Sequence, residues 1–176
     1  KTAETVSSAK KKCPQLVIAS PHYEKYSEYS AKVNAIYSKY TDMVEPFGID
    51  ESWLDVTASR KIFGTGEQIA ELIRREVKEA VGITVSIGVS FNKVFAKLGS
   101  DYKKPNATTV FDRRAVEEIV YRLPVGDMMF VGKKTAQHLS HMGITTIGAL
   151  ARTDEAVLRH ALGEQGGVLW KYANGL

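Results

Sequence analysis

The chain has 176 residues, a formal net charge of +4, 44% hydrophobic and 25% charged residues. This length allows one large or two small domains with a buried core. The single cysteine, Cys13, excludes an internal disulfide and a zinc cluster of paired thiolates, and we expect a partly buried structural thiol. The sequence contains neither an apolar run of 18 residues nor a signal-peptide pattern, which predicts a cytoplasmic protein without a membrane segment. The basic charge permits nucleic-acid binding without establishing it.

The N-terminal part predicts a helix and then a strand. Thr2–Lys12 has a helical pattern that ends before Pro14. Because this pattern has no start signal after Lys1, we expect the helix to begin in residues that precede Lys1. Leu16–Ala19 is a short apolar run, typical of a strand. Tyr23–Tyr40 then predicts a helix, because Tyr29, Val33, Ile36, Tyr37 and Tyr40 fall on one face of a 3.6-residue period.

Two adjacent carboxylates stand between two strand-like runs. Met43–Ile49 and Trp53–Thr57 flank Asp50 and Glu51, which indicates a hairpin with the acidic pair at its tip. Neighbouring side chains on a regular strand point to opposite faces, whereas at a hairpin tip both can turn toward one hard cation. Such a cation would relieve the repulsion between the two carboxylates. The alternative is that Asp-Glu is ordinary turn chemistry.

A second helix and its charged face come next. After a polar loop over residues 59–66, Thr65 and Gln68 have the spacing of a capping box, and Gly82 is the expected end of the helix. The apolar positions are Ile69, Leu72, Ile73, Val77, Ala80 and Val81. The other face carries charges of both signs and predicts a solvated surface: Glu71, Arg74, Arg75, Glu76, Lys78 and Glu79.

The following residues complete a predicted α+β domain. Ile83–Val89 alternates as a strand does, Ser90 is the expected cap of a helix that ends near Gly99, and Ala107–Phe111 predicts a last strand. The order β-α-β-β-α-β, followed by a short helix and a final strand, is typical of a ferredoxin-like (split βαβ) domain. Such a domain has a mainly antiparallel sheet with two helices on one face.

Lysines surround the basic turn Ser100–Asn106. Lys93 and Lys97 project together from the predicted helix before it, and Lys104 lies within it. A solvated basic loop is one interpretation. If the turn faces Asp50 and Glu51, however, lysines and carboxylates around one cleft are what metal-assisted phosphoryl transfer requires. The four histidines show no spacing typical of a metal site.

From Asp112 onward the pattern is helical throughout, so we expect a domain boundary near Phe111. Within this part, a short helix from about Gly126, a turn at Val131-Gly132 and a helix closing at Gly143 resemble a helix-hairpin-helix, a motif that grips the DNA backbone. Gly132, Lys133, Lys134 and Thr135 begin the second helix and could bind a phosphate. The usual motif has Gly-x-Gly, whereas the first position here is Phe130. A plain glycine turn is the alternative.

Four segments together resemble one family. They are Phe47-Gly48-Ile49-Asp50-Glu51-Ser52-Trp53-Leu54-Asp55, the run from Ser86 to Asp101, Lys104-Pro105-Asn106, and Val131–Leu139. In order and spacing they look like the Y-family of translesion DNA polymerases, in particular its bacterial DNA polymerase IV-like branch. The likeness covers essentially the whole chain.

The resemblance implies domains and roles. Residues 1–15 would be a remnant of the fingers, 16–111 the palm and 112–176 a small all-α thumb. Asp50 and Glu51 match the catalytic carboxylates that bind two Mg²⁺ ions. Lys104 matches a lysine that contacts the triphosphate of the incoming nucleotide, with Lys97 and Asp101 in supporting roles. The implied partners are primer–template DNA and deoxynucleoside triphosphates, and a sliding clamp through regions absent here.

The departures from the family imply an incomplete enzyme. Family members begin with a strand that carries a third metal-binding aspartate, followed by the body of the fingers, and a little-finger domain follows the thumb. None of these is in the sequence, so we expect an excerpt that is inactive as a polymerase. Two rival interpretations are a non-catalytic DNA-binding module that uses the thumb and another palm-type enzyme such as a nucleotide cyclase.

Overall fold

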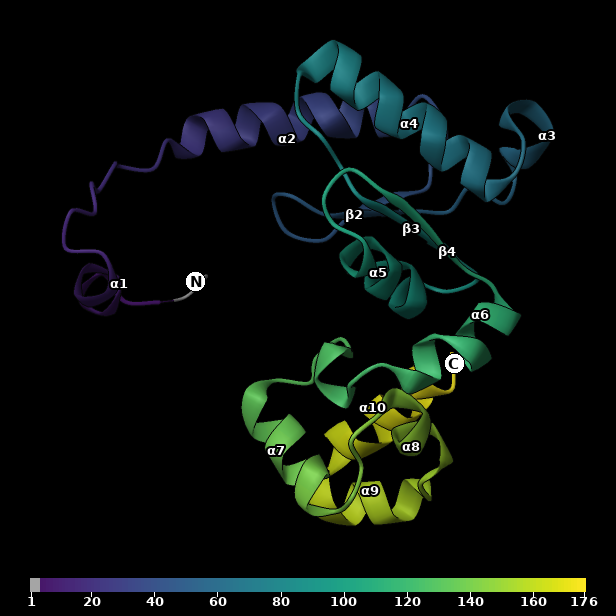
Figure 1. Ribbon diagram of the computed structural model, residues 1–176. Helices are drawn as coiled ribbons and strands as arrows, with labels where there is room; N and C mark the ends of the chain where they lie inside the picture. Colours follow the sequence, from purple (N-terminus) through teal and green to yellow (C-terminus); the bar gives the residue numbers. More distant parts are fainter. Residues whose placement is uncertain (1–3) are drawn as a thin grey trace.

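The computed structural model describes residues 4–176, which form a strand-bearing lobe followed by a helical lobe (Figure 1). The first lobe contains α1 (Val6–Lys12), α2 (Tyr23–Tyr37), β1 (Val44–Pro46), β2 (Ser52–Leu54), α3 (Arg60–Phe63), α4 (Gly66–Val81), β3 (Ile87–Ser90), α5 (Lys93–Tyr102) and β4 (Thr108–Phe111). The second contains α6 (Arg113–Glu118), the 3₁₀ turns η1 (Val120–Arg122) and η2 (Val125–Asp127), α7 (Lys133–His141), α8 (Ile147–Arg152), α9 (Glu155–Leu162) and α10 (Glu164–Ala173). The mixture of helix and sheet agrees with the expected class.

The strands form two separate pairs. β1 and β2 are antiparallel, with Glu45 opposite Trp53, whereas β3 and β4 are parallel, with Ile87 opposite Thr108. α2 and α4 lie together on one side of the strands, and α5 lies on the other side (Figure 1). The expectation of a mainly antiparallel sheet is therefore wrong for the described strands. The crossover through α5 returns the chain in the same direction, which makes the second pair parallel.

Several helix ends follow the sequence signals, whereas both ends of α5 differ from expectation. Both hydrogen bonds of the Thr65–Gln68 capping box form, and Gly82 has the left-handed conformation that ends α4. α5 begins after Asn92, not after Ser90, because the Asn92 side chain accepts the N–H of Phe95 while the Ser90 hydroxyl donates to the carbonyl of Phe111. α5 also continues beyond Gly99 to Tyr102.

The N-terminal arm differs most from expectation. α1 begins at Val6 with Thr5 as its cap, and the start of the predicted helix lies outside the described residues. Leu16–Ala19 forms no strand, and Val17 is 89% exposed, because no neighbouring strand pairs with this segment. Cys13 is exposed rather than partly buried. The polar loop over residues 59–66 contains the one-turn helix α3.

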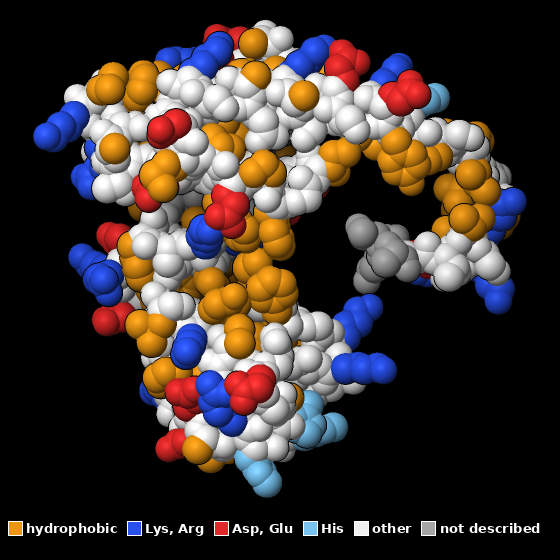
Figure 2. All heavy atoms as spheres, turned by 180° about the vertical axis from the view of Figure 1, so that it is seen from behind, with side chains coloured by type: hydrophobic (Ala, Val, Ile, Leu, Met, Phe, Trp, Pro, Cys, Tyr) orange, Lys and Arg blue, Asp and Glu red, His pale blue; other side chains and the backbone are white. Residues whose placement is uncertain are grey.

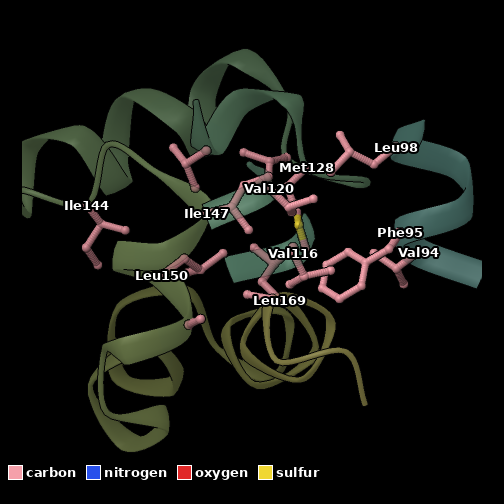
Figure 3. Packing of buried hydrophobic residues seen from close by; sticks show 14 of the residues in the cluster. Val94, Phe95, Leu98, Val116, Val120, Met128, Ile144, Ile147, Leu150 and Leu169 are labelled. Carbon is pink, nitrogen blue, oxygen red and sulfur yellow. The ribbon is translucent and has the colours of Figure 1, made fainter. Parts of the chain in front are cut away.

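The buried hydrophobic residues form two clusters. The first lies between α2 and α4 and consists of Val33, Ile36, Tyr40, Ile69, Ile73 and Val77. The second, shown in Figure 3, joins α5 to the helical lobe, and its members include Val94, Phe95, Leu98, Val116, Val120, Met128, Ile144, Ile147, Leu150 and Leu169. Because α5 contributes side chains to the second cluster, the helical lobe packs directly on the strand-bearing lobe.

The charged face of α4 is less solvated than expected. The Tyr40 hydroxyl donates to Glu76 at 2.7 Å, and the ammonium of Lys39 pairs with the same carboxylate. Burial, followed by the hydrogen bond to Glu76, raises the pKa of Tyr40 to about 12. Through Glu76, this face of α4 therefore contacts the residues that directly follow α2.

The contact between β3 and α5 depends on Gly88. A Cβ atom at residue 88 would lie 1.8 Å from the carbonyl oxygen of Ala96 and 2.5 Å from the amide nitrogen of Ser100. We predict that Gly88→Ala lowers the free energy of unfolding by about 3 kcal/mol, because backbone atoms must separate. Urea denaturation measures this change.

Gly126→Ala is the matched control, since a Cβ there meets only the Ala136 methyl group at an ordinary 3.7 Å. It should change the unfolding free energy by less than about 1 kcal/mol. Equal effects of the two substitutions would contradict the close approach of α5 to β3.

Candidate functional site

The tip of the β1–β2 hairpin presents the two adjacent carboxylates. The N–H of Phe47 donates to the carbonyl of Glu51 at 2.8 Å and closes the loop, in which Gly48 adopts a left-handed conformation with φ of 81°. The Ser52 hydroxyl donates to the Asn34 side chain at 2.7 Å and ties the hairpin to α2. The sequence prediction of a hairpin is confirmed, with strands shorter than the apolar runs.

A chain of ion pairs connects the hairpin to α5 and the following turn. The ammonium of Lys97 lies 3.0 Å from a Glu51 carboxylate oxygen and 2.6 Å from an Asp101 oxygen. The ammonium of Lys104 lies 2.6 Å from the other Asp101 oxygen. Lys97 is the most enclosed member, with 20% of its side chain exposed. It therefore links the acidic tip to the basic turn.

The pairing shifts two pKa values in opposite directions. Burial alone would lower the pKa of Lys97, but the ion pairs with Asp101 and Glu51 outweigh it and raise the pKa. For Asp101, burial acts to raise the pKa, whereas Lys104 and Lys97 together lower it. Both shifts favour the charged forms of Lys97 and Asp101.

Four of the predicted residues line one cavity of about 710 Å³: Asp50, Glu51, Lys97 and Lys104. Asp101 is not among the residues that line the cavity, but it forms ion pairs with both lysines. The structure therefore brings together the acidic hairpin and the basic turn, which are far apart in the sequence. This proximity weakens the alternative of a solvated basic loop without testing the roles predicted for these residues.

The turn that carries Lys104 is held by a residue that the sequence did not single out. The Arg74 guanidinium donates to the carbonyl and the side-chain oxygen of Asn106, at 2.9 and 2.8 Å. The Lys104–Pro105 peptide bond is cis, and Asn106 has a φ of 53°. Arg74 was expected on the solvated face of α4, but only 24% of its side chain is exposed. Nothing in the local pattern distinguishes it from its exposed neighbours.

Asp50 and Glu51 are the two side chains predicted to bind a cation. Mg²⁺ prefers oxygen ligands, so the chemistry of Asp50 and Glu51 suits it. Among residues 4–176, however, no three acidic, histidine or cysteine side chains group together as a metal site, and Glu51 is already paired with Lys97.

The second group of predicted residues lies apart, at the start of α7. The first N–H groups of a helix have no intrahelical partner. In α7 the N-cap is Gly132, which has no side chain to accept from them. Lys133 and Lys134 are exposed, and neither takes part in an ion pair among the residues that the structure describes. Gly132, Lys133, Lys134 and Thr135 are not part of the cavity of Asp50 and Glu51.

The turn before α7 contains a strained residue. Phe130 has a φ of 65°, in the position where the usual motif has glycine. A left-handed conformation costs a residue with a Cβ about 1–2 kcal/mol. The ring of Phe130 is 54% exposed, and its centroid lies 6.0 Å from that of Tyr172 on α10.

Comparisons with known proteins agree with these features. The crystal structure of DinB from Sulfolobus solfataricus superposes with a TM-score of 0.88 and 27% identity, over 99% of this chain and 52% of that one. An insertion ternary complex of Dbh DNA polymerase gives a TM-score of 0.87 at 27% identity, over 99% of this chain and 52% of that chain. The fold is therefore that of Y-family polymerase domains.

Sequence relatives identify the family more closely. A DNA polymerase IV of Acetivibrio thermocellus is 48% identical over 99% of this chain and 44% of its own length, and one from Pseudomonas entomophila is 42% identical over 100% and 50%. The sequence profile of the impB/mucB/samB family matches residues 1–101. The chain belongs to this family. It spans about half the length of the curated relatives it matches.

The described part of the chain, residues 4–176, contains no helix that is both long and apolar enough to cross a membrane.

The ion-pair chain makes a prediction about acid pH. Because the pKa of Asp101 is lowered in the folded protein, its contribution to stability is present above its ordinary pKa of 3.8 and is lost as the pH falls through the folded value. Lys97→Met should move the pKa of Asp101 upward, toward 3.8, and should weaken this acid dependence. A carboxyl-carbon NMR titration of Asp101 measures the shift.

Lys93→Met is the control, because it removes the same charge from α5 one turn earlier, where the partner is Glu45. It should leave the Asp101 titration unchanged. An Asp101 pKa that is the same in wild type and Lys97→Met would show that Lys97 does not hold this carboxylate.

Proposed function

We propose that this chain is the palm and thumb part of a template-directed, error-prone translesion DNA polymerase that adds deoxynucleotides to a primer 3′-hydroxyl. Residues 16–111 would be the palm, 112–176 the thumb and 1–15 the end of the fingers. The observation that carries the proposal is the convergence of Asp50, Glu51, Lys97 and Lys104 on one cavity. Family membership and the superposition on a ternary polymerase complex support it.

The residues of the cavity have separate roles in this reaction. Asp50 and Glu51 would hold Mg²⁺, which supplies charge neutralisation during in-line nucleotidyl transfer. Lys104 pairs with Asp101 but has 56% of its side chain exposed, so it would contact the triphosphate of the incoming nucleotide. Lys97 would orient Glu51 and Asp101, and Asp101 would hold Lys104 at the mouth of the cavity.

Activity would need more than this chain provides. The two-metal reaction uses three metal-binding carboxylates, whereas the described residues group only two of them, Asp50 and Glu51. We therefore expect the 176-residue chain alone to be inactive. The complete activity, with primer–template DNA and the four deoxynucleoside triphosphates as substrates, would belong to a longer polypeptide. A sliding clamp would contact regions outside this chain, and we place the protein in the cytoplasm.

A non-catalytic DNA-binding module is the second candidate. It is favoured by one observation, the separation of the exposed lysines at the start of α7 from the cavity. In that case the helical lobe would bind DNA and the strand-bearing lobe would be a scaffold. The nucleotide cyclase alternative has no support from the comparisons, which match polymerases.

The metal-binding role of the hairpin is tested in the full-length polymerase that contains this chain. Asp50→Ala and Glu51→Ala should each reduce primer extension with Mg²⁺ by about 100-fold or more, because transition-state charge loses its stabilisation. DNA binding should remain. Gel-resolved primer extension and fluorescence anisotropy measure the two properties.

Glu45→Gln is the matched control on the same hairpin, since Glu45 pairs with Lys93 and is not part of the cavity. Its extension rate should equal that of the wild type. Full extension by Asp50→Ala and Glu51→Ala would refute the metal site, and a wild type that binds DNA without extending it would favour the binding module.

The thumb lysines are tested with the 176-residue chain itself. Lys133→Ala combined with Lys134→Ala should make the negative slope of log Kobs against log salt concentration shallower by about 2 for duplex DNA, because two phosphate contacts are lost. The control pair is Lys61→Ala with Lys78→Ala, which removes equal charge from exposed sites on α3 and α4. If both double variants made the slope equally shallower, the effect would come from net charge and not from phosphate contacts at the start of α7.

A further inference from the structure

Arg74 differs from the other charged residues of α4 in the partners that it binds. Figure 2 shows acidic and basic side chains next to each other along the edge of the molecule where Figure 1 places α2 and α4. Arg75 belongs to this exposed surface, whereas only 24% of the Arg74 side chain is exposed. Its Nη2 donates to Glu71 at 2.6 Å, and both of its hydrogen bonds to Asn106 come from Nη1. The guanidinium therefore connects α4 to the turn after α5.

Few polar contacts fasten the turn that carries Lys104. Within the described part of the chain, residues 104–106 are held by the ion pair between Lys104 and Asp101 and by the two hydrogen bonds from Arg74 to Asn106. The end of α5 fixes the turn on one side, and the pairing of β4 with β3 fixes it on the other. Between these two ends, the conformation of the turn depends on Asp101 and Arg74.

The two contacts respond differently to a triphosphate in the cavity. The ammonium of Lys104 lies 2.6 Å from Asp101, and a triphosphate would compete with this carboxylate for the same ammonium. Arg74 does not line the cavity, so a ligand there leaves its bonds to Asn106 in place. Asn106 does line the cavity, together with Lys104 and Pro105. The Arg74 contact can thus hold the backbone of the turn while the Lys104 side chain changes its partner.

We propose that Arg74 is a positioning residue for the incoming nucleotide, because by holding Asn106 it keeps Lys104 directed into the cavity. This inference rests on the proposed function, since it takes Lys104 as a contact to the triphosphate. Arg74 acts through the turn and does not touch the substrate. A turn that is fixed before binding loses less freedom when the ligand arrives, so the effect belongs to nucleotide binding and not to the chemical step.

The test is single-turnover primer extension by the full-length polymerase that contains this chain, with the concentration of one deoxynucleoside triphosphate varied. Arg74→Met should raise the nucleotide Kd about 10-fold and change the maximal rate less than about twofold, because ground-state binding is lost while the carboxylates stay in place. The affinity for primer–template DNA, measured by fluorescence anisotropy, should not change. Arg75→Met is the control, since it removes the same charge from the next residue of α4, and it should behave as the wild type does.

Asn106→Gly tests the same contact from the side of the turn. Glycine accepts the φ of 53° and keeps the carbonyl that Arg74 binds, but it removes the side-chain oxygen. This variant should raise the nucleotide Kd about 3-fold, which is less than the effect of Arg74→Met. The double variant should have the Kd of Arg74→Met alone, because both substitutions remove the same contact.

Lys104→Met shows whether Arg74 acts through this lysine. It should raise the nucleotide Kd by itself, and the addition of Arg74→Met should raise the Kd no further. If the two effects multiply instead, Arg74 does not act through Lys104, and the inference is overturned.

Two other results would overturn the inference and leave the proposed function intact. One is a wild-type nucleotide Kd in Arg74→Met beside a raised Kd in Lys104→Met. The other is a lower thermal midpoint and a reduced rate in Arg74→Met with an unchanged Kd, which would make Arg74 a structural residue only. If the wild-type polymerase binds primer–template DNA without extending it, the proposed function fails, and this inference fails with it.

Discussion

The close approach of α5 to β3 is the constraint on which the rest of the structure depends. Gly88 leaves no side chain between the two elements, so the backbone of α5 around Ala96 lies directly on the strand. One face of α5 then directs Lys97 toward Glu51, and another directs Phe95 into the core of the helical lobe. A single helix thereby fixes both the charged cavity and the attachment of the second lobe (Figures 1 and 3).

This arrangement couples the two regions that we propose to act on DNA. The cavity lies between the hairpin and α5, and the start of α7 lies on the lobe whose core includes Val94 and Leu98 of the same helix. Because well-packed interiors resist small changes in volume, the two regions keep a constant relation to each other. A polymerase needs a fixed position of its catalytic residues relative to the duplex that it binds.

The sequence predicted the features that depend on local chemistry. The capping box at Thr65 and the helix end at Gly82 each depend on residues within one turn, so the local sequence was sufficient to place them. The hairpin also followed from a local pattern, and its tip and the basic turn were found together in one cavity. Their assigned roles remain predictions, although the resemblance to the polymerase family is confirmed.

Features that depend on distant partners were not predictable in this way. The segment Leu16–Ala19 has the composition of a strand, but a strand forms only where another strand pairs with it. The role of Arg74 depends on Asn106, and the parallel pairing of β3 depends on the path of the chain through α5. The left-handed φ of Phe130, next to the buried Val131, is likewise not visible in the spacing of the sequence.

The division of the strands into two pairs also affects how this chain behaves in concentrated solution. In the part of the chain described here, each strand hydrogen-bonds to one neighbour, so each pair has two open edges. Open edges and the exposed apolar segment at Leu16, Val17 and Ile18 are templates for edge-to-edge association. We therefore expect these 176 residues to self-associate when they are studied alone, and to do so more strongly as the protein concentration rises.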